Sequence, residues 1–161
     1  MFRTPALPLS HPAGLVATWF GVGLLPYAPG TWGSFVALPF AWAIHLYGGV
    51  WLLAAAVVVV SLLGWLAAAL YIRAHGKEDP GDVVVDEVAG QWLTLLPAAG
   101  DIGLMAAGFV LFRAADIYKP WPAGWADRRI KGGLGTMVDD LFAGAYAALG
   151  VLALRFLVEA I

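Results

Sequence analysis

The sequence predicts an all-α integral membrane protein. We expect a single domain over residues 1–161, a helical bundle of about three to five membrane-embedded helices with a cytoplasm-facing polar site. Of its residues, 61% are hydrophobic and 12% are charged, whereas soluble domains average about 25% charged residues. Residues 48–72 carry no charge over 25 residues, and about 20 apolar residues suffice to cross a bilayer as a helix. The charged residues gather in a few short segments.

The expected helices follow the apolar stretches in chain order. Residues 34–47 form a short stretch that ends at a glycine pair, and residues 48–72 form the clear span. Residues 83–112 are apolar but interrupted by PAAGD at 97–101, so we expect two helices that are each shorter than a full span. Residues 141–158 are about long enough to cross.

Basic residues gather at one end of this predicted bundle if successive helices alternate in direction. Arg155 is then left at the opposite end, and the positive-inside rule makes the basic end cytoplasmic. The formal net charge of −2 argues against a nucleic-acid partner, which requires a basic surface. The basic end contains eight of the nine Lys and Arg residues: Arg3, Arg73, Lys77, Arg113, Lys119, Arg128, Arg129 and Lys131.

Residues 21–34, GVGLLPYAPGTWGS, contain four glycines and two prolines. They predict an ordered loop that contains Thr31 and ends at a helix start. Backbone N–H groups at a helix start can bind an anion. A structural turn at the membrane interface would have the same composition.

Residues 79–90, DPGDVVVDEVAG, place two carboxylates among apolar residues. We expect a helix from Val83 onward with Asp82 as its N-cap, which puts Asp86 and Glu87 one turn inside. An ionised carboxylate there costs several kcal/mol unless it is paired, protonated or bound to a metal. Alternatively, both residues lie in the headgroup zone and are solvated.

Residues 113–140 hold five basic and four acidic residues. Arg113, Asp116 and Lys119 recur at helical spacing and share a face, and Pro120 ends that helix. A further basic run follows at residues 128–131, and an ordinary juxtamembrane patch on anionic lipid would explain it.

The last helix is expected to begin near Asp139 and Asp140, where carboxylates favour the helix dipole. The chain has no cysteine, and clustered carboxylates favour a hard cation such as Mg²⁺. Basic side chains beside that ion suit a phosphate. The combination therefore predicts phosphoryl transfer or phosphate-ester hydrolysis. The five carboxylates are Asp86, Glu87, Asp116, Asp139 and Asp140.

Four ordered motifs over about residues 20–145 resemble the bacterial phosphatidylglycerophosphatase A family: PYAPGTWGS, DPGDVVVDEVAGQWLTLL, FRAADIYKPWP and GGLGTMVDDLFAG. The resemblance implies a Mg²⁺-dependent, multi-pass enzyme of the bacterial inner membrane. Its reaction would convert the lipid phosphatidylglycerophosphate to phosphatidylglycerol and inorganic phosphate in phospholipid biosynthesis. The family usually has an aromatic residue where this chain has Ala115, which bears on packing and substrate fit.

By position, the resemblance puts the family's lysine on Lys119 and its loop threonine on Thr31. Its acidic positions fall on the five carboxylates named above. We expect these residues to divide into three groups. The metal ligands are Asp86, Glu87, Asp139 and Asp140; the catalytic residues are Asp86, Asp116 and Lys119; the substrate-binding residues are Thr31, Arg113, Arg128, Arg129 and Lys131.

The nucleophile stays open at this point, because either an aspartate or an activated water could attack phosphorus. The oligomeric state is open as well. One alternative function is another metal-dependent membrane phosphomonoesterase. A small proton- or cation-coupled transporter is less favoured, because such proteins spread their charges through the membrane depth.

Overall fold

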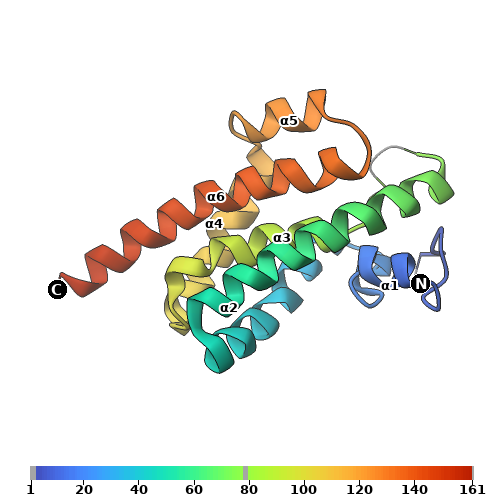
Figure 1. Cartoon of the computed structure of the whole chain (residues 1–161). Helices are drawn as coiled ribbons and strands as arrows, with labels where there is room; N and C mark the ends of the chain where they lie inside the picture. Colours follow the sequence, from blue (N-terminus) through green and yellow to red (C-terminus); the bar gives the residue numbers. More distant parts are fainter. Residues whose placement is uncertain (1–2, 78–79, 161) are drawn as a thin grey trace.

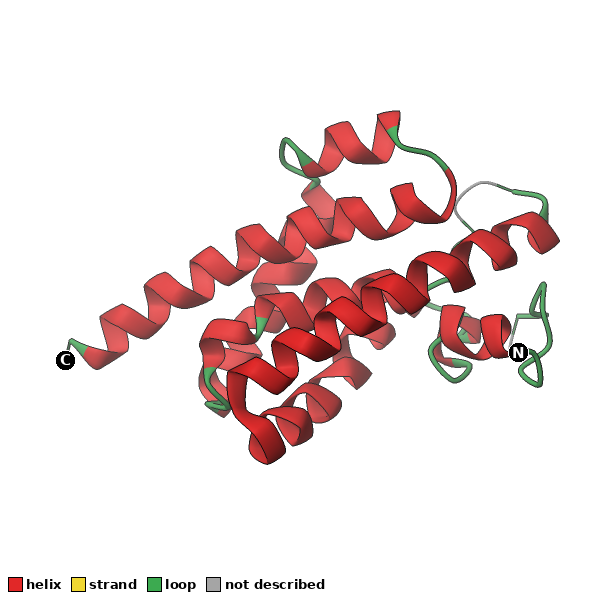
Figure 2. Ribbon diagram, viewed as in Figure 1, coloured by secondary structure: helices red, strands yellow, loops and turns green. Residues whose placement is uncertain are grey.

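The computed structural model describes residues 3–77 and 80–160. Within these ranges every regular element is helical (Figure 2), which confirms the predicted all-α class. The α-helices are α1 (Pro12–Ala17), α2 (Pro29–His75), α3 (Val85–Thr94), α4 (Ile102–Tyr118), α5 (Ala123–Arg129) and α6 (Gly132–Glu159). Two short 3-10 helices, η1 (Val22–Leu24) and η2 (Leu96–Ala98), lie between them.

Helix α2 is divided in two by a reversal of the chain at Gly49 (Figure 1). Gly49 has φ 64° and ψ −162°, a conformation that glycine adopts because it lacks a Cβ. We call residues 29–48 the first arm of α2 and residues 50–75 its second arm. The predicted division at the glycine pair is confirmed, and the first arm begins five residues earlier than the apolar stretch 34–47 indicated.

Helices α2 and α6 are long enough and apolar enough to cross a membrane. Large hydrophobic side chains on both helices are exposed, among them Val58, Leu62 and Leu149. In water such an outer surface would be unfavourable, whereas in lipid it is solvated by acyl chains. The arrangement fits a membrane helical protein, as the composition predicts.

Short α3 lies between α2 and α6 and contacts α6 backbone to backbone. A Cβ added to Gly144 would lie 2.5 Å from the Gly90 carbonyl oxygen, and one added to Gly90 would lie 2.6 Å from the Asp140 carbonyl oxygen. Only glycines permit this approach. The crossing also sets the distance between the carboxylates of α3 and those of α6.

Because Gly144 contacts backbone, a methyl group at this position should force α3 and α6 apart. We expect Gly144→Ala to lower the free energy of unfolding by about 1–3 kcal/mol. Thermal unfolding in detergent would measure this effect. Gly103→Ala in α4 is the control, because the nearest atom to its added Cβ is a side-chain oxygen at 3.2 Å. An equal loss of stability in both variants would contradict the proposed crossing.

Two further predicted helix starts are wrong. Helix α3 begins at Val85 with Val84 at its N-cap, so Asp86 and Glu87 lie in its first turn. Asp82 instead accepts hydrogen bonds from Arg3 at 3.1 Å and from the Tyr71 hydroxyl at 3.3 Å. These long-range partners hold the Asp82 carboxylate away from the helix amides. Asp79, in the same motif, lies outside the described residues.

Helix α6 begins at Gly132, so the GGLG segment forms its first turn. Asp139 and Asp140 therefore lie about two turns inside the helix, where they are buried. The predicted boundary at PAAGD is confirmed, because Ala99 and Gly100 have positive φ and Asp101 caps α4.

Candidate active site

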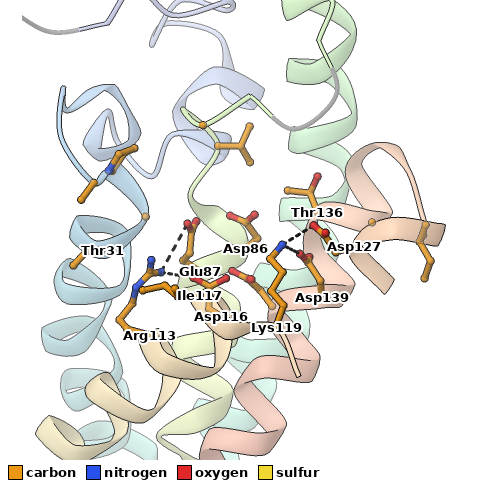
Figure 3. Close-up of a pocket in the computed structure, with 18 of the residues that line it drawn as sticks. Thr31, Asp86, Glu87, Arg113, Asp116, Ile117, Lys119, Asp127, Thr136 and Asp139 are labelled. Carbon is orange, nitrogen blue, oxygen red and sulfur yellow. Dashed lines mark hydrogen bonds and ion pairs between the residues drawn. The ribbon is translucent and has the colours of Figure 1, made fainter. Parts of the chain in front are cut away.

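A charged cavity of about 670 Å³ lies where α2 and α6 begin, α3 begins and α4 ends. Figure 3 shows its side chains pointing toward one another from these separate helices. Residues far apart in sequence thus line one cavity. The predicted site residues that line it are Thr31, Asp86, Glu87, Arg113, Asp116, Lys119, Lys131, Asp139 and Asp140.

Asp86, Glu87 and Asp140 form an acidic cluster, in which one carboxylate oxygen from each lies within 4.8 Å of the others. Asp86 and Asp140 are 8% and 4% exposed. Within the described part of the chain, Asp86 Oδ1 and Glu87 Oε2 are buried without a hydrogen-bond partner. Converging, unpaired carboxylate oxygens are the ligands that a hard divalent cation prefers.

Burial raises the pKa of Asp86 well above its usual range, and the neighbouring charges of Glu87 and Asp140 raise it further. Burial also raises the pKa of Glu87, to about 7. Both shifts have the same physical cause, because like charges removed from water disfavour ionisation. A bound cation would remove this penalty.

Arg113, in α4, contacts a carboxylate of the acidic cluster, a second carboxylate in α4 and a hydroxyl group in α2. Its Nη1 lies 2.7 Å from Asp116 and 4.0 Å from Glu87, and it donates a hydrogen bond to the Ser34 hydroxyl at 3.3 Å. This ion pair confirms the predicted shared face for Arg113 and Asp116. Arg113 therefore brings positive charge to the edge of the cluster. Lys119 departs from the prediction, because it lies at the C-cap of α4 in a left-handed conformation and contacts two other carboxylates instead.

Lys119 lies between two carboxylates on the other side of the cavity (Figure 3). Its Nζ donates to Asp127 at 2.5 Å and to Asp139 at 2.7 Å. Burial lowers the pKa of Lys119, but these hydrogen bonds outweigh burial and raise it above its usual range. The same contact holds the pKa of Asp127 below its usual range. Lys119 is thus a fixed cation.

Asp139 differs from its neighbour Asp140 in what it contacts. One oxygen of Asp139 accepts from Lys119, and the other, Oδ1, is buried without a partner among the described residues. The three-residue cluster contains Asp140 and not Asp139. Consecutive helical residues point about 100° apart, so one aspartate faces the cluster and the other faces Lys119.

The start of α2 forms the rim above Glu87. Gly30 and Thr31 line the cavity, and their amides lie in the first turn, where N–H groups lack intrahelical acceptors. A Cβ on Gly30 would lie 1.9 Å from Glu87 Oε1. A side chain at this position would displace the Glu87 carboxylate from the start of α2. The predicted helix start is present, but it falls at Pro29, so Thr31 lies in the first turn of α2 and not in a loop. This helix start brings donors and a positive helix end to the cavity.

Arg128 and Arg129 do not line the cavity. Both lie exposed in the last turn of α5, whose buried face consists of Ala123, Gly124 and Ala126. The short helix thus directs their side chains outward. Lys131, two residues further on, does line the cavity.

Asp127 is a site residue that the sequence analysis did not assign. It lines the cavity and holds Lys119. The sequence held one signal for this contact: Asp127 follows Lys119 by eight residues, with the PWP turn between them. A compact loop of that length brings its two ends close together.

Known proteins similar to this chain agree with this chemistry. The profile of the family described as Phosphatidylglycerophosphatase A matches residues 15–155. Phosphatidylglycerophosphatase A of Escherichia coli K12 is 41% identical, covering 91% of this chain and 84% of that protein. The protein of the same name from Haemophilus influenzae is 34% identical, covering 93% of each chain.

A third relative, from Bacteroides thetaiotaomicron, is provisionally described as a phosphatidylinositol-3-phosphatase. It is 35% identical, covering 89% of this chain and 94% of that protein. No solved structure matches the chain significantly. The matches cover nearly all of the chain, including every helix that forms the charged cavity. The chain therefore belongs to the phosphatidylglycerophosphatase A family and is a phosphatase.

Proposed function

We propose that this protein is a Mg²⁺-dependent lipid phosphatase that hydrolyses phosphatidylglycerophosphate to phosphatidylglycerol and inorganic phosphate. The observation that carries the proposal is the acidic cluster beside two fixed cations, Lys119 and Arg113, in one cavity. Carboxylates alone would repel a phosphate, and cations alone would bind it without a metal. Their combination suits a phosphomonoester held on a divalent ion.

The residues fit Mg²⁺, because the cluster offers oxygen ligands and two of its buried oxygens have no protein partner. We assign Asp86, Glu87 and Asp140 as direct ligands. Asp139 faces Lys119 outside this cluster, so we assign it as a ligand through a bound water. When bound, Mg²⁺ would neutralise charge on the phosphate oxygens and orient the ester. Ca²⁺ would accept the same oxygen ligands, so the identity of the ion is part of the proposal.

Lys119 and Arg113 then hold the remaining phosphate oxygens, aided by Lys131 and the amides at the start of α2. Asp116 is the carboxylate that we assign to the reacting side, as nucleophile or as base for water. Its ion pair with Arg113 at 2.7 Å fixes its orientation. Water supplies the oxygen that replaces the glycerol oxygen on phosphorus, and one proton ends on that glycerol oxygen.

The location of the cavity supports a lipid substrate at the cytoplasmic face of the bacterial inner membrane. The cavity lies at one end of α2 and α6, the two apolar helices. Arg155 lies at the other end, where it donates to the Pro97 carbonyl at 3.4 Å. A phosphorylated headgroup can therefore enter the cavity while its acyl chains stay in lipid. A transporter is disfavoured, because these charges gather at one end instead of following a path through the bundle.

Phosphate release from a panel of phospholipids in one detergent tests the substrate assignment. We expect release from phosphatidylglycerophosphate to exceed release from phosphatidylinositol 3-phosphate and phosphatidic acid by at least about tenfold in kcat/KM. The relative from Bacteroides makes the inositol lipid the specific alternative. Faster release from that lipid would overturn the proposed substrate and leave the phosphatase assignment intact.

A further inference from the structure

A second cavity lies on the flank of the bundle, between the first arm of α2 and the first half of α4. Its volume is about 300 Å³. We call it the flank groove. It is lined by Leu38, Pro39, Trp42, Ile102, Met105 and Ala106. All six side chains are hydrophobic, so the flank groove cannot bind a charged or strongly polar molecule.

The two helices of the flank groove are also the helices of the charged cavity. Trp42 lies about three turns, or about 16 Å, beyond Thr31 along α2. On α4, Ala106 lies about 15 Å before Asp116 by the same helical rise. One leaflet contributes about 15 Å of hydrocarbon. With the charged cavity at the membrane surface, the flank groove therefore lies around the bilayer midplane, which the ends of acyl chains of that leaflet reach.

An aromatic pair lies, by position along α2 and α4, between the residues of the charged cavity and those of the flank groove. The rings of Phe35 and Phe109 meet edge to face with centroids 6.0 Å apart. Phe35 is 53% exposed and lies one turn below Thr31. Apolar side chains therefore lie at the helix positions that separate the two cavities.

We propose that the flank groove binds one acyl chain of the phospholipid whose phosphate occupies the charged cavity. This inference rests on the proposed function. A tethered chain is favoured over bulk lipid, because binding of the headgroup fixes its acyl chains nearby and raises their effective concentration at the groove. Acyl-chain binding remote from the phosphate also positions the phosphoester for reaction. The enzyme should therefore prefer long-chain substrates.

The test fills the flank groove and compares two substrates. Ala106 is exposed, so Ala106→Trp adds a large ring to the groove without entering the core. The control is Ala153→Trp, at an exposed position of α6 that does not line the groove. Each protein is assayed in one detergent with didecanoyl and with dibutanoyl phosphatidylglycerophosphate. The readout is the ratio of the two kcat/KM values.

We expect Ala106→Trp to lower kcat/KM for the didecanoyl substrate about tenfold. This is the effect expected if about two methylene groups of the acyl chain are no longer buried in the groove. The value for the dibutanoyl substrate should stay within about twofold. Ala153→Trp should leave the ratio unchanged. Ala106→Leu, a smaller replacement that serves if the Trp variant does not fold, should shift the ratio in the same direction by less.

Three results would overturn the inference: an unchanged ratio in both Ala106 variants, an equal loss on both substrates, or an equal shift in Ala153→Trp. A wild-type protein that releases phosphate from other phospholipids but from neither of these substrates would instead overturn the proposed substrate. The acyl-chain assignment would then fall with it. The wild-type rates therefore separate failure of the proposed function from failure of the inference.

Discussion

Asp86→Asn should abolish phosphate release while making the metal-free protein more stable. The carboxylate is buried beside Glu87 and Asp140, so an amide removes a ligand and also removes a buried like charge. We expect kcat/KM to fall by at least about a hundredfold, since even residues that only support a metal ligand cost 10–100-fold. In EDTA, the free energy of unfolding should rise by about 1 kcal/mol or more.

Asp101→Asn is the matched control for that experiment. Asp101 caps α4 through a 2.8 Å hydrogen bond from the Leu104 amide, and asparagine is an equally good N-cap. Neither activity nor stability should change by more than about twofold or 0.5 kcal/mol. If Asp86→Asn instead lowers the free energy of unfolding in EDTA, this carboxylate stabilises the fold. That result would contradict the prediction that activity falls while stability rises.

Lys119→Met should also reduce phosphate release by at least about a hundredfold, through loss of charge stabilisation at the phosphate. In this variant the metal-free protein should become less stable, by about 1–3 kcal/mol. The reason is that buried Asp139 and half-buried Asp127 lose their shared cation. The opposite stability changes of Asp86→Asn and Lys119→Met distinguish a like-charge cluster from an ion-paired one.

Arg129→Met is the control for Lys119→Met, because it removes a basic residue from the same end of the molecule. Arg129 is exposed and does not line the charged cavity, so kcat should stay within about twofold. The kcat of both variants is measured with saturating substrate. An equal loss of kcat in the two variants would show that positive charge near the membrane matters more than the position of Lys119.

The sequence predicts this fold best where a local signal decides the structure. The positive φ of Gly49 divides α2 where the glycine pair indicated, and Asp101 begins α4 after the predicted turn. Acidic residues in an apolar chain likewise predicted which carboxylates lie together, because all five of them line the charged cavity. Each of these signals acts within a few residues.

The predictions failed where distant contacts override local preference. Asp82 is a good N-cap by type, but Arg3 and Tyr71 bind its carboxylate across 79 and 11 residues of chain. Which of Asp139 and Asp140 faces the acidic cluster depends on how α6 is rotated about its axis. The glycine contacts between α6 and α3 set that rotation. No local pattern encodes that rotation.

The buried acidic cluster, as we propose, holds a divalent cation that is required for phosphate release. The most direct test of this claim is phosphate release from phosphatidylglycerophosphate by protein stripped with EDTA, followed by titration with Mg²⁺. We predict that stripping abolishes release and that Mg²⁺ restores it with saturation, in the wild type but not in Asp86→Asn. Undiminished release by folded protein from which the metal has been removed would contradict the claim.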